Sequence, residues 1–424
     1  MEQAPPFLRY TCRGKRILSR RADSIAKTGH VTAEPKERVY LVAVEVKGRG
    51  NSRWTSESSL EELAQLALTA GANVVGRCVQ RLERRTSAYY VGRGKVQELA
   101  SLRHRLGYST VIFDEELSPS QQRNLEDALQ IKVLDRTALI LDIFAQHART
   151  REGALQVELA QHEYLLPRLA GQWTHLERLE GAIGTRGPGE TQLETDRRLI
   201  RRKIQRLKRQ LEEVRRQRAL YRRRRARQRV PVISLVGYTN AGKSTLMRAL
   251  SGADVLVEDK LFATLDPVTR RVALPQGGAF LLTDTVGFIQ SLPTQLVAAF
   301  RATLEELSEA SLLLHVVDIT HPDAAEQAQT VEDTLADLGL ADKPSITVFN
   351  KADLICGPDG SPIEGLESLG EARASLRYWR PDAVLVSAVK GWGLADLLGR
   401  IEDALGLGEE SEAASWGYRV PLAG

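Results

Sequence analysis

The pattern of apolar and polar positions divides the chain into three parts. Between residues 39 and 150, short apolar runs alternate with amphipathic stretches, which predicts a small α/β domain with a mainly parallel sheet. Residues 1–38 lack this pattern and are basic, so we expect a disordered N-terminal arm. The predicted strands are 39–46, 74–82, 88–91, 110–113 and 131–134, and the predicted helices are 58–70, 95–106, 119–129 and 137–149.

The second part, residues 151–229, has a different period. Its apolar residues recur at alternating steps of four and three in two stripes, which predicts two helices packed as an antiparallel coiled-coil hairpin. Pro167 predicts a kink in the first helix, because it removes a helical hydrogen bond. Residues 181–190 hold four glycines and a proline, so we predict a mobile tip there. The first stripe contains Leu155, Leu159, His162, Leu166, Leu169, Trp173 and Leu176, and the second contains Ile200, Ile204, Leu207, Leu211, Val214 and Tyr221.

The third part, residues 230–407, returns to alternating elements. Apolar runs at 232–236, 280–283, 345–349 and 384–386 predict buried strands, and 245–250 predicts the first turns of a helix. We expect a second α/β domain with a mainly parallel sheet, followed by a short tail at 408–424.

Composition narrows the class of protein. The chain has 424 residues and is 42% hydrophobic, which is enough for two or three domains with their own cores. Its three cysteines form no C-x-x-C pair, so no zinc site is predicted. No apolar run approaches the ~18 residues that cross a bilayer. We therefore expect a monomeric cytoplasmic protein without a membrane span.

Positive charge is concentrated in one predicted helix. Residues 196–229 contain 17 Lys and Arg against 3 acidic residues, a net charge of +14. Since the whole chain carries +5, the remainder carries −9. A run of one sign is typical of a protein that binds a polyanion, so we favour nucleic acid over a merely solvated helix face.

A glycine-rich motif predicts where a nucleotide binds. The pattern G-x-x-x-x-G-K-S follows the strand at 232–236 and precedes a helix, which is the context of a phosphate-binding loop. In such a loop, Lys243 reaches the β- and γ-phosphates and Ser244 ligates Mg²⁺. The predicted contacts are Gly237, Tyr238, Thr239, Asn240, Ala241, Gly242, Lys243, Ser244 and Thr245.

The base is predicted to be guanine. The strand at 345–349 runs into the sequence N-K-A-D, and a carboxylate there accepts two hydrogen bonds from guanine. Adenine would leave that carboxylate unpaired. We therefore assign Asp353 to the base, Asn350 to bracing the loop, and the stem of Lys351 to covering the base. The backbones of Ser387 and Ala388, after the strand at 384–386, are expected to contact the base.

Two further segments are predicted to hold magnesium and sense the γ-phosphate. The strand at 280–283 runs into Asp284, Thr285, Val286 and Gly287. We expect Asp284 to hold Mg²⁺ through a water and the Gly287 N–H to sense the γ-phosphate. Thr264 is the candidate for the second hydroxyl on Mg²⁺, with an ordinary loop threonine as the alternative. The predicted catalytic residues are Lys243, Thr264 and Gly287.

Phe288 bears on the rate of hydrolysis. Ras-like GTPases place a glutamine after the glycine to orient the attacking water, and Phe288 can neither donate nor accept a hydrogen bond. Either another group or a partner positions the water, or Phe288 only packs its segment against the domain. We expect slow intrinsic hydrolysis that a partner stimulates.

Taken together, the chain resembles the HflX-type GTPases of the Obg–HflX group over residues 39–407. The most specific similarity is the sequence at 159–169 followed by the glycine-rich run at 184–194. Segments 261–266 and 299–306 are similar to the switch regions of that family. Asn240 matches an asparagine with which some related GTPases help to bind a potassium ion, and a turn-forming asparagine is the alternative.

The resemblance implies a GTP- and GDP-binding protein with Mg²⁺ as cofactor. It also implies that the large ribosomal subunit and its rRNA are the partners, and that stalled ribosomes are split or rescued. Two N-terminal subdomains would precede the GTPase domain, whereas the extra C-terminal domain of some members finds little room here. The alternative functions are an RNA-binding or rRNA-remodelling protein that uses nucleotide as a structural ligand, and a signalling switch with protein partners.

Overall fold

A computed structural model gives the structure of the protein. It describes residues 36–47, 54–172, 188–226, 230–252, 261–262, 264–275, 277–290, 307–356, 361, 363, 365–369, 380 and 383–406. The predicted basic arm before residue 36, most of the predicted tip, and the tail lie outside these residues. So do the segment 299–306 and the side chains of the four consecutive arginines at 222–225.

The N-terminal domain is built on a parallel sheet with the strand order β2-β1-β3-β4. The predicted α/β architecture is therefore confirmed, but the strand predicted at 88–91 is wrong. Those residues form a turn closed by a bridge between Thr86 and Tyr90, and the left-handed φ of 65° at Tyr90 is incompatible with an extended strand. The strands are β1 (Arg38–Val46), β2 (Asn73–Leu82), β3 (Thr110–Phe113) and β4 (Lys132–Asp135).

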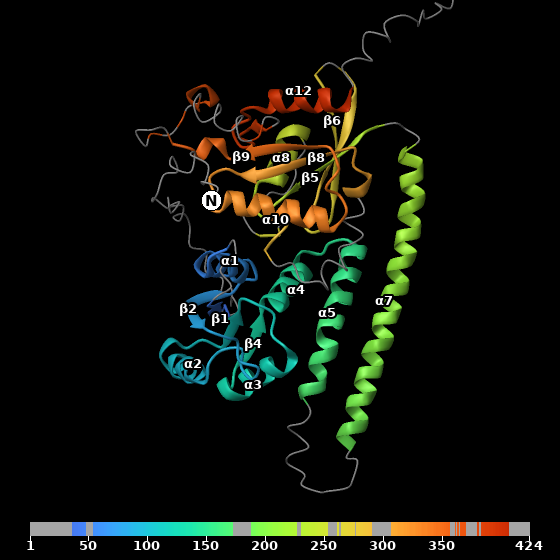
Figure 1. Cartoon of the computed structure of the whole chain (residues 1–424). Coiled ribbons are helices and arrows are strands. Elements are labelled where there is room, and N and C mark those ends of the chain that lie inside the picture. Colours follow the sequence, from blue (N-terminus) through green and yellow to red (C-terminus); the bar gives the residue numbers. More distant parts are fainter. Residues whose placement is uncertain are drawn as a thin grey trace, which may run out of the picture.

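Helices cover both faces of this sheet (Figure 1). Side chains of α1 and α4 share one hydrophobic cluster with Val39 and Leu41 of β1. Side chains of α2 and α3 share another cluster with Tyr40 and Val42. Because β1 is buried on both sides, its sequence is almost continuously apolar, as is typical of parallel sheets. The helices are α1 (Ser56–Thr69), α2 (Arg93–Leu106), α3 (Pro119–Leu129) and α4 (Arg136–His147).

The helical arm consists of α5 (Arg151–Gln172) and α7 (Pro188–Ala226), which lie side by side and antiparallel in Figure 1. Pro167 lies inside α5. Residues 188–190, which we predicted as part of the tip, belong to α7 instead, because proline is favoured in the first helical turn. The seam between the helices follows the predicted stripes and contains Leu155, Leu159, Leu166, Ile200, Ile204, Leu207 and Leu211.

The C-terminal domain has a second sheet with the strand order β10-β9-β8-β5-β7-β6. All its pairings are parallel except that between β6 and β7. The strands are β5 (Val232–Gly237), β6 (Val268–Ala273), β7 (Ala279–Asp284), β8 (Leu312–Asp318), β9 (Ser345–Asn350) and β10 (Val384–Leu385). Short 3₁₀ helices span Ala352–Leu354 and Leu366–Leu369.

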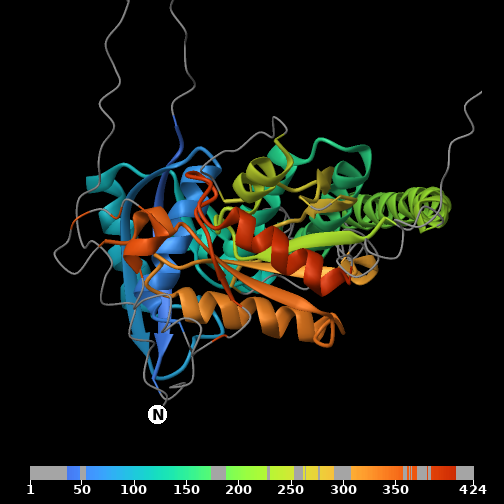
Figure 2. The same cartoon turned by 90° about the horizontal axis from the view of Figure 1, so that it is seen from above.

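Among the described residues of this domain, three α-helices flank the sheet. Apolar side chains of α8 (Lys243–Ser251) and α12 (Leu394–Leu405) pack in one cluster, and those of α10 (Ala324–Asp337) pack in another. Figure 2 shows α12 and α10 on opposite sides of the strands. Among the helices of the described residues, none is sufficiently long and apolar to span a membrane.

One hydrophobic cluster joins the two domains. It contains Leu60 and Leu63 of α1, Phe144 of α4, and also Tyr238 and Leu313 of the C-terminal domain. The domains are therefore packed directly on each other, and the loop that follows β5 lies at their boundary.

Candidate nucleotide-binding site

The predicted site residues come together at one edge of the C-terminal sheet. Because β5, β7, β9 and β10 run in the same direction, the segments that follow them meet at the carboxyl edge. Ligands of open α/β sheets bind at this edge. The four segments carry the phosphate-binding loop and residues 284–287, 350–353 and 387–388.

The phosphate-binding loop has a backbone conformation that its sequence permits. Asn240 and Gly242 have left-handed φ values of 61° and 92°. A Cβ atom at Gly242 would collide with the side-chain amide of Asn350, so this position requires glycine. That amide donates a hydrogen bond of 3.0 Å to the carbonyl of Ala241. Asn350 therefore braces the loop from the end of β9.

Lys243 is a buried cation at the first position of α8. Its Nζ donates hydrogen bonds to the carbonyls of Gly237 and Tyr238, at 3.1 and 2.9 Å. Burial lowers the pKa of Lys243 to about 8, and the nearby charge of Asp284 opposes this shift. A cation held in a dry site by neutral carbonyls favours an anionic ligand.

Two hydroxyls and a carboxylate converge beside this lysine. The Ser244 hydroxyl donates to Asp284 Oδ2 at 2.6 Å, and the Thr264 hydroxyl donates to the same oxygen at 3.0 Å. The two hydroxyl oxygens are 2.8 Å apart. Asp284 Oδ1 is buried, and no described residue donates a hydrogen bond to it. This cluster of oxygen atoms has the chemistry of a site for a hard cation.

Gly287 lies against the phosphate-binding loop. A Cβ atom at Gly287 would come within 2.8 Å of the Thr239 backbone and within 3.0 Å of Lys243 Nζ. The next residue, Phe288, is buried and pairs through its backbone with Gly237 and Thr239. Phe288 thus packs its segment against the loop, which is one of the two roles considered from the sequence.

The residues predicted to read the base form a second group. The Ser387 hydroxyl donates to Asp353 Oδ1 at 2.5 Å, and the Ala388 N–H donates to Asn350 Oδ1 at 3.1 Å. Lys351 has a left-handed φ of 66°, and its Nζ forms an ion pair of 2.7 Å with Asp318. The segments after β9 and β10 are therefore fastened to each other. Asp318, which orients Lys351, was not among the predicted residues.

Some predicted contacts face other parts of the molecule. The Thr285 hydroxyl donates to the carbonyl of Leu235 at 2.6 Å and so joins β7 to β5. Val286 packs against the cluster that joins the domains. Thr245 is the third residue of α8. The Tyr238 side chain is directed to the N-terminal domain, where its ring stacks on Trp54.

Tyr238 belongs to a polar junction that the sequence did not predict. Its hydroxyl donates to the Glu62 carboxylate of α1 and accepts the Gln290 N–H at 2.8 Å. Arg136, which is 3% exposed, forms ion pairs with Glu62 and with Asp114, the latter at 2.8 Å. The N-terminal domain therefore contacts both the phosphate-binding loop and the segment that follows Gly287.

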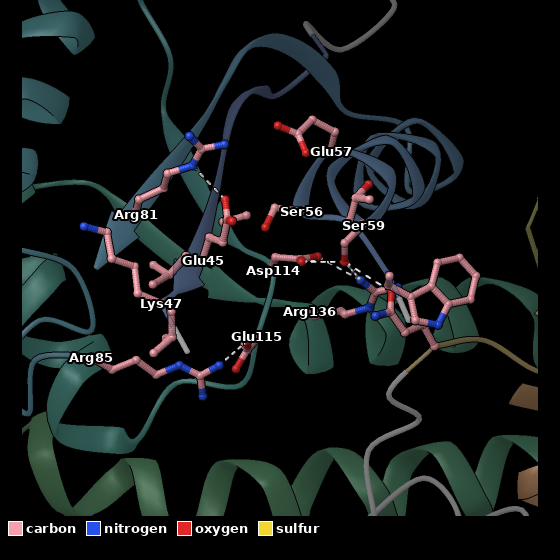
Figure 3. Close-up of a pocket in the computed structure, with 16 residues that line it drawn as sticks. Glu45, Lys47, Ser56, Glu57, Ser59, Arg81, Arg85, Asp114, Glu115 and Arg136 are labelled. Atoms are coloured by element: carbon pink, nitrogen blue, oxygen red, sulfur yellow. Dashed lines mark hydrogen bonds and ion pairs between the residues drawn. The ribbon is translucent and has the colours of Figure 1, made fainter. Parts of the chain in front are cut away.

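Apart from this site, the N-terminal domain has a hollow at the carboxyl ends of β1, β2 and β3 (Figure 3). Its volume is about 640 Å³. Two of the cations along its wall pair with acidic neighbours: Arg81 with Glu45 at 3.0 Å, and Arg85 with Glu115. The hollow thus occupies the topological place of a ligand site, and part of its charge is paired within the protein.

Three protein-family models match consecutive parts of the chain. Residues 57–145 match the model described as GTP-binding GTPase N-terminal, and residues 147–225 match GTP-binding GTPase Middle Region. Residues 232–351 match the model described as 50S ribosome-binding GTPase.

Proteins named GTPase HflX are similar to most of the chain. The one from Caldanaerobacter subterraneus subsp. tengcongensis is 53% identical over 323 residues, which cover 76% of this chain and 74% of the relative. The one from Escherichia coli is 44% identical over 362 residues, or 85% and 82% of the two chains. The crystal structure of a GTP-binding protein from Sulfolobus solfataricus in complex with GDP is also similar, with 25% sequence identity and a TM-score of 0.43. The match covers 87% of this chain and 98% of that protein.

Proposed function

Since this chain belongs to the HflX family of GTPases, we propose that it binds the large ribosomal subunit and splits or rescues stalled ribosomes. The chain is a GTP-hydrolysing enzyme that binds guanine nucleotide. The observation that supports a nucleotide-dependent function is the arrangement at one edge of the C-terminal sheet. Lys243, the Ser244–Thr264–Asp284 cluster and the residues assigned to the base converge there.

We assign magnesium to the oxygen cluster beside Lys243. Ser244 and Thr264 offer hydroxyl ligands, and Asp284 supplies a buried carboxylate that would hold a magnesium-bound water. These residues would hold Mg²⁺, which would supply positive charge to neutralise the phosphates of the nucleotide. Lys243 would bind the same phosphates, and the Gly287 N–H would sense the γ-phosphate.

We assign guanine recognition to Asp353. Its carboxylate is held by the Ser387 hydroxyl, so it is oriented before a base arrives. Guanine offers two N–H donors to such a carboxylate, whereas adenine would leave it without a partner. The ion pair with Asp318 fixes the Lys351 stem, which would cover one face of the base.

The hydrolytic step requires a contribution from outside the site. Phe288 replaces the glutamine that orients water in Ras-like enzymes, and its side chain is buried in the cluster that joins the domains. We therefore propose that the isolated protein hydrolyses GTP slowly and that the large ribosomal subunit completes the site. A potassium ion beside Asn240 would be part of the same transition-state stabilisation.

The arm is the proposed rRNA-binding element. Phosphates of rRNA attract a dense row of cations, and the attraction weakens as salt replaces the released counterions. The matching family model for residues 232–351 is described as a ribosome-binding GTPase, which agrees with this partner. Exposed cations of α7 among the described side chains include Arg198, Arg201, Arg202, Lys203, Arg206, Lys208, Arg209 and Arg216.

Turnover of GTP with and without large ribosomal subunits tests the proposal. We expect slow turnover by the protein alone and an increase of at least about tenfold with large subunits, since a missing catalytic group is worth 10²–10³-fold. Small subunits at equal concentration are the control. Subunit binding without stimulation would favour the alternative, an rRNA-binding protein with a structural nucleotide. Exchanging potassium for sodium, in the wild type and in Asn240→Ala, tests the potassium assignment.

A further inference from the structure

We propose that Asp266 is a positioning residue that ties the nucleotide site to the helical arm. Asp266 holds the segment that carries Thr264, and it does so by binding the N-terminus of α5. The position of the arm would then decide whether the Thr264 hydroxyl reaches magnesium. This inference rests on the proposed function, because it uses the assignment of Thr264 to Mg²⁺.

The Asp266 carboxylate is bound at the start of α5. Its Oδ2 accepts the Arg149 N–H at 2.8 Å and the Thr150 N–H at 2.7 Å, and its Oδ1 accepts the Thr150 hydroxyl. Thr150 in turn caps the helix, because its hydroxyl oxygen accepts the Gly153 N–H at 3.0 Å. A carboxylate at this end is favoured by the partial positive charge of the helix N-terminus.

Gly153 makes room for this contact. A Cβ atom at position 153 would collide with Asp266 Oδ1, so any larger residue would displace the carboxylate. Gly153 does not have a left-handed backbone, and it lies inside the first turn of α5, where alanine would form a better helix. The glycine is therefore explained by the close approach of Asp266.

Apolar contacts hold the same segment against the N-terminal half. Phe262 and Leu265, on either side of Thr264, are each 2% exposed. The Phe262 ring packs edge-on against Phe144 of α4, with 4.6 Å between the ring centroids. Between these anchors, Thr264 reaches Asp284 and Ser244. The segment is thus fixed on both sides of the residue that would bind magnesium.

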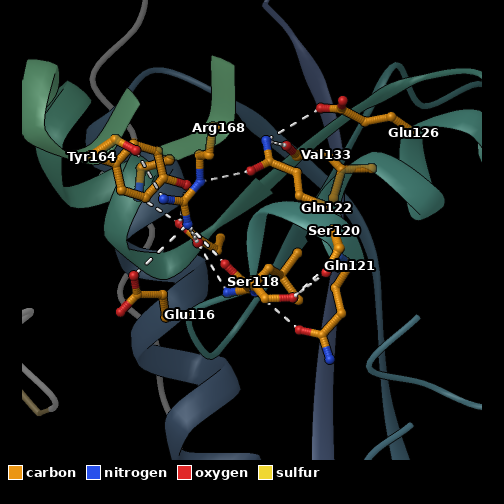
Figure 4. A network of polar contacts seen from close by, with 12 residues as sticks. Glu116, Ser118, Ser120, Gln121, Gln122, Glu126, Val133, Tyr164 and Arg168 are labelled. Atoms are coloured by element: carbon orange, nitrogen blue, oxygen red, sulfur yellow. Dashed lines mark hydrogen bonds and ion pairs between the residues drawn. The ribbon is translucent and has the colours of Figure 1, made fainter. Parts of the chain in front are cut away.

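Arg168 fastens helix α5 to the N-terminal domain (Figure 4). The Arg168 guanidinium donates to the carbonyl of Leu117 at 2.8 Å, to Gln122 at 3.0 Å and to the buried Asp135 at 3.1 Å. It also lies 3.4 Å from the centroid of the Tyr164 ring. A displacement of the arm would therefore be transmitted along α5 to its N-terminus, where Asp266 is bound.

Affinity for a non-hydrolysable GTP analogue, measured against Mg²⁺ concentration, tests this role. Asp266→Ala should weaken analogue binding at limiting Mg²⁺ by about fivefold, the equivalent of one lost helix cap, and leave GDP affinity unchanged. Asp266→Asn should fall between, since its amide keeps one accepting oxygen. Asp342→Ala, which removes an exposed carboxylate of the same domain, is the matched control.

Gly153→Ala separates positioning from simple helix stability. The melting temperature should lie above that of Asp266→Ala, because the preference of alanine for the helix offsets part of the loss of the hydrogen bonds to the carboxylate. It should nevertheless weaken analogue binding in the manner of Asp266→Ala, because it displaces the carboxylate. A variant that is stable and yet defective cannot be explained by loss of fold.

Thr264→Ala separates the assignment of Thr264 to Mg²⁺ from the positioning role of Asp266. If it leaves the magnesium response unchanged, the assignment of Thr264 to Mg²⁺ fails, and this inference fails with it. If Thr264→Ala is defective while Asp266→Ala, Asp266→Asn and Gly153→Ala all match Asp342→Ala, only the role of Asp266 is overturned. A magnesium-dependent defect in Gly153→Ala and Asp266→Ala supports it.

Discussion

Two buried cations each stand at the start of a helix that follows a strand. Arg136 begins α4 directly after β4, and Lys243 begins α8 after β5 and its loop. They are 3% and 7% exposed. Arg136 is matched by the carboxylates of Glu62 and Asp114, whereas the hydrogen bonds of Lys243 go to two neutral carbonyls.

The difference separates a structural cation from a binding cation. A buried charge that is already paired stabilises the protein only while its partners remain, because removal of one partner leaves the others uncompensated. A buried charge held by carbonyls alone leaves electrostatic attraction available for a ligand. One buried cation thus belongs to a domain junction, and the other is available for the phosphate contact that we propose.

The largest effect should come from Lys243→Met. Loss of the charge on the phosphates should reduce GTP hydrolysis by about 10²–10³-fold. The nucleotide-free protein should remain folded, because methionine fills the same space and removes the cost of burying a charge, which offsets part of the loss of the hydrogen bonds to Gly237 and Tyr238. GTP turnover and denaturant unfolding of the same preparation measure the loss of hydrolysis and the stability of the variant. Unchanged turnover would remove Lys243 from the site.

Arg136→Met should show the opposite pattern. It leaves Glu62 and Asp114 buried without a cation, which costs about 3–5 kcal/mol of unfolding free energy. Denaturant unfolding without nucleotide measures the loss. The triple variant with Glu62→Gln and Asp114→Asn should recover most of it. If Arg136→Met is as stable as the wild type, Arg136 does not have the structural role that distinguishes it from Lys243.

The smallest effect is a pH dependence from Lys243. Its pKa is about 8 in the folded protein against 10.5 ordinarily, so the unfolded chain binds more protons between these values. Stability of the nucleotide-free protein should therefore rise with pH across this window, by at most about 3 kcal/mol. Lys243→Met should lack this rise, and a parallel pH profile in both proteins would contradict the burial of a charged lysine.

Local sequence patterns identified the segments that meet at the carboxyl edge of the C-terminal sheet, whereas they did not identify the contacts between the two domains. The phosphate-binding loop, residues 284–287 and residues 350–353 follow strands whose apolar runs are evident in the sequence, and parallel strands place such segments together. The turn at 88–91 was missed because the apolar pattern cannot show the left-handed backbone of Tyr90. The start of α7 was missed because glycine and proline suggested a loop.

The junctions were missed for a different reason. Tyr238 binds Glu62 across 176 positions, and Asp266 binds Thr150 across 116. Each residue looks ordinary among its neighbours, since tyrosine in a loop and aspartate before proline have common local roles. Only the packing of the two domains shows which distant partner each one meets.

The length of α7 gives the arm a mechanical property. Its 39 residues extend about 58 Å, and the helix ends a short step before β5, whose other end opens into the phosphate-binding loop. The helix is therefore a lever whose pivot lies at the start of β5, one strand length from the phosphate-binding loop. A rotation of about 5° at the pivot would sweep the far end through about 5 Å, close to one helical pitch. A small rotation where the arm joins β5 would then become a displacement of several ångströms at the far end of α7.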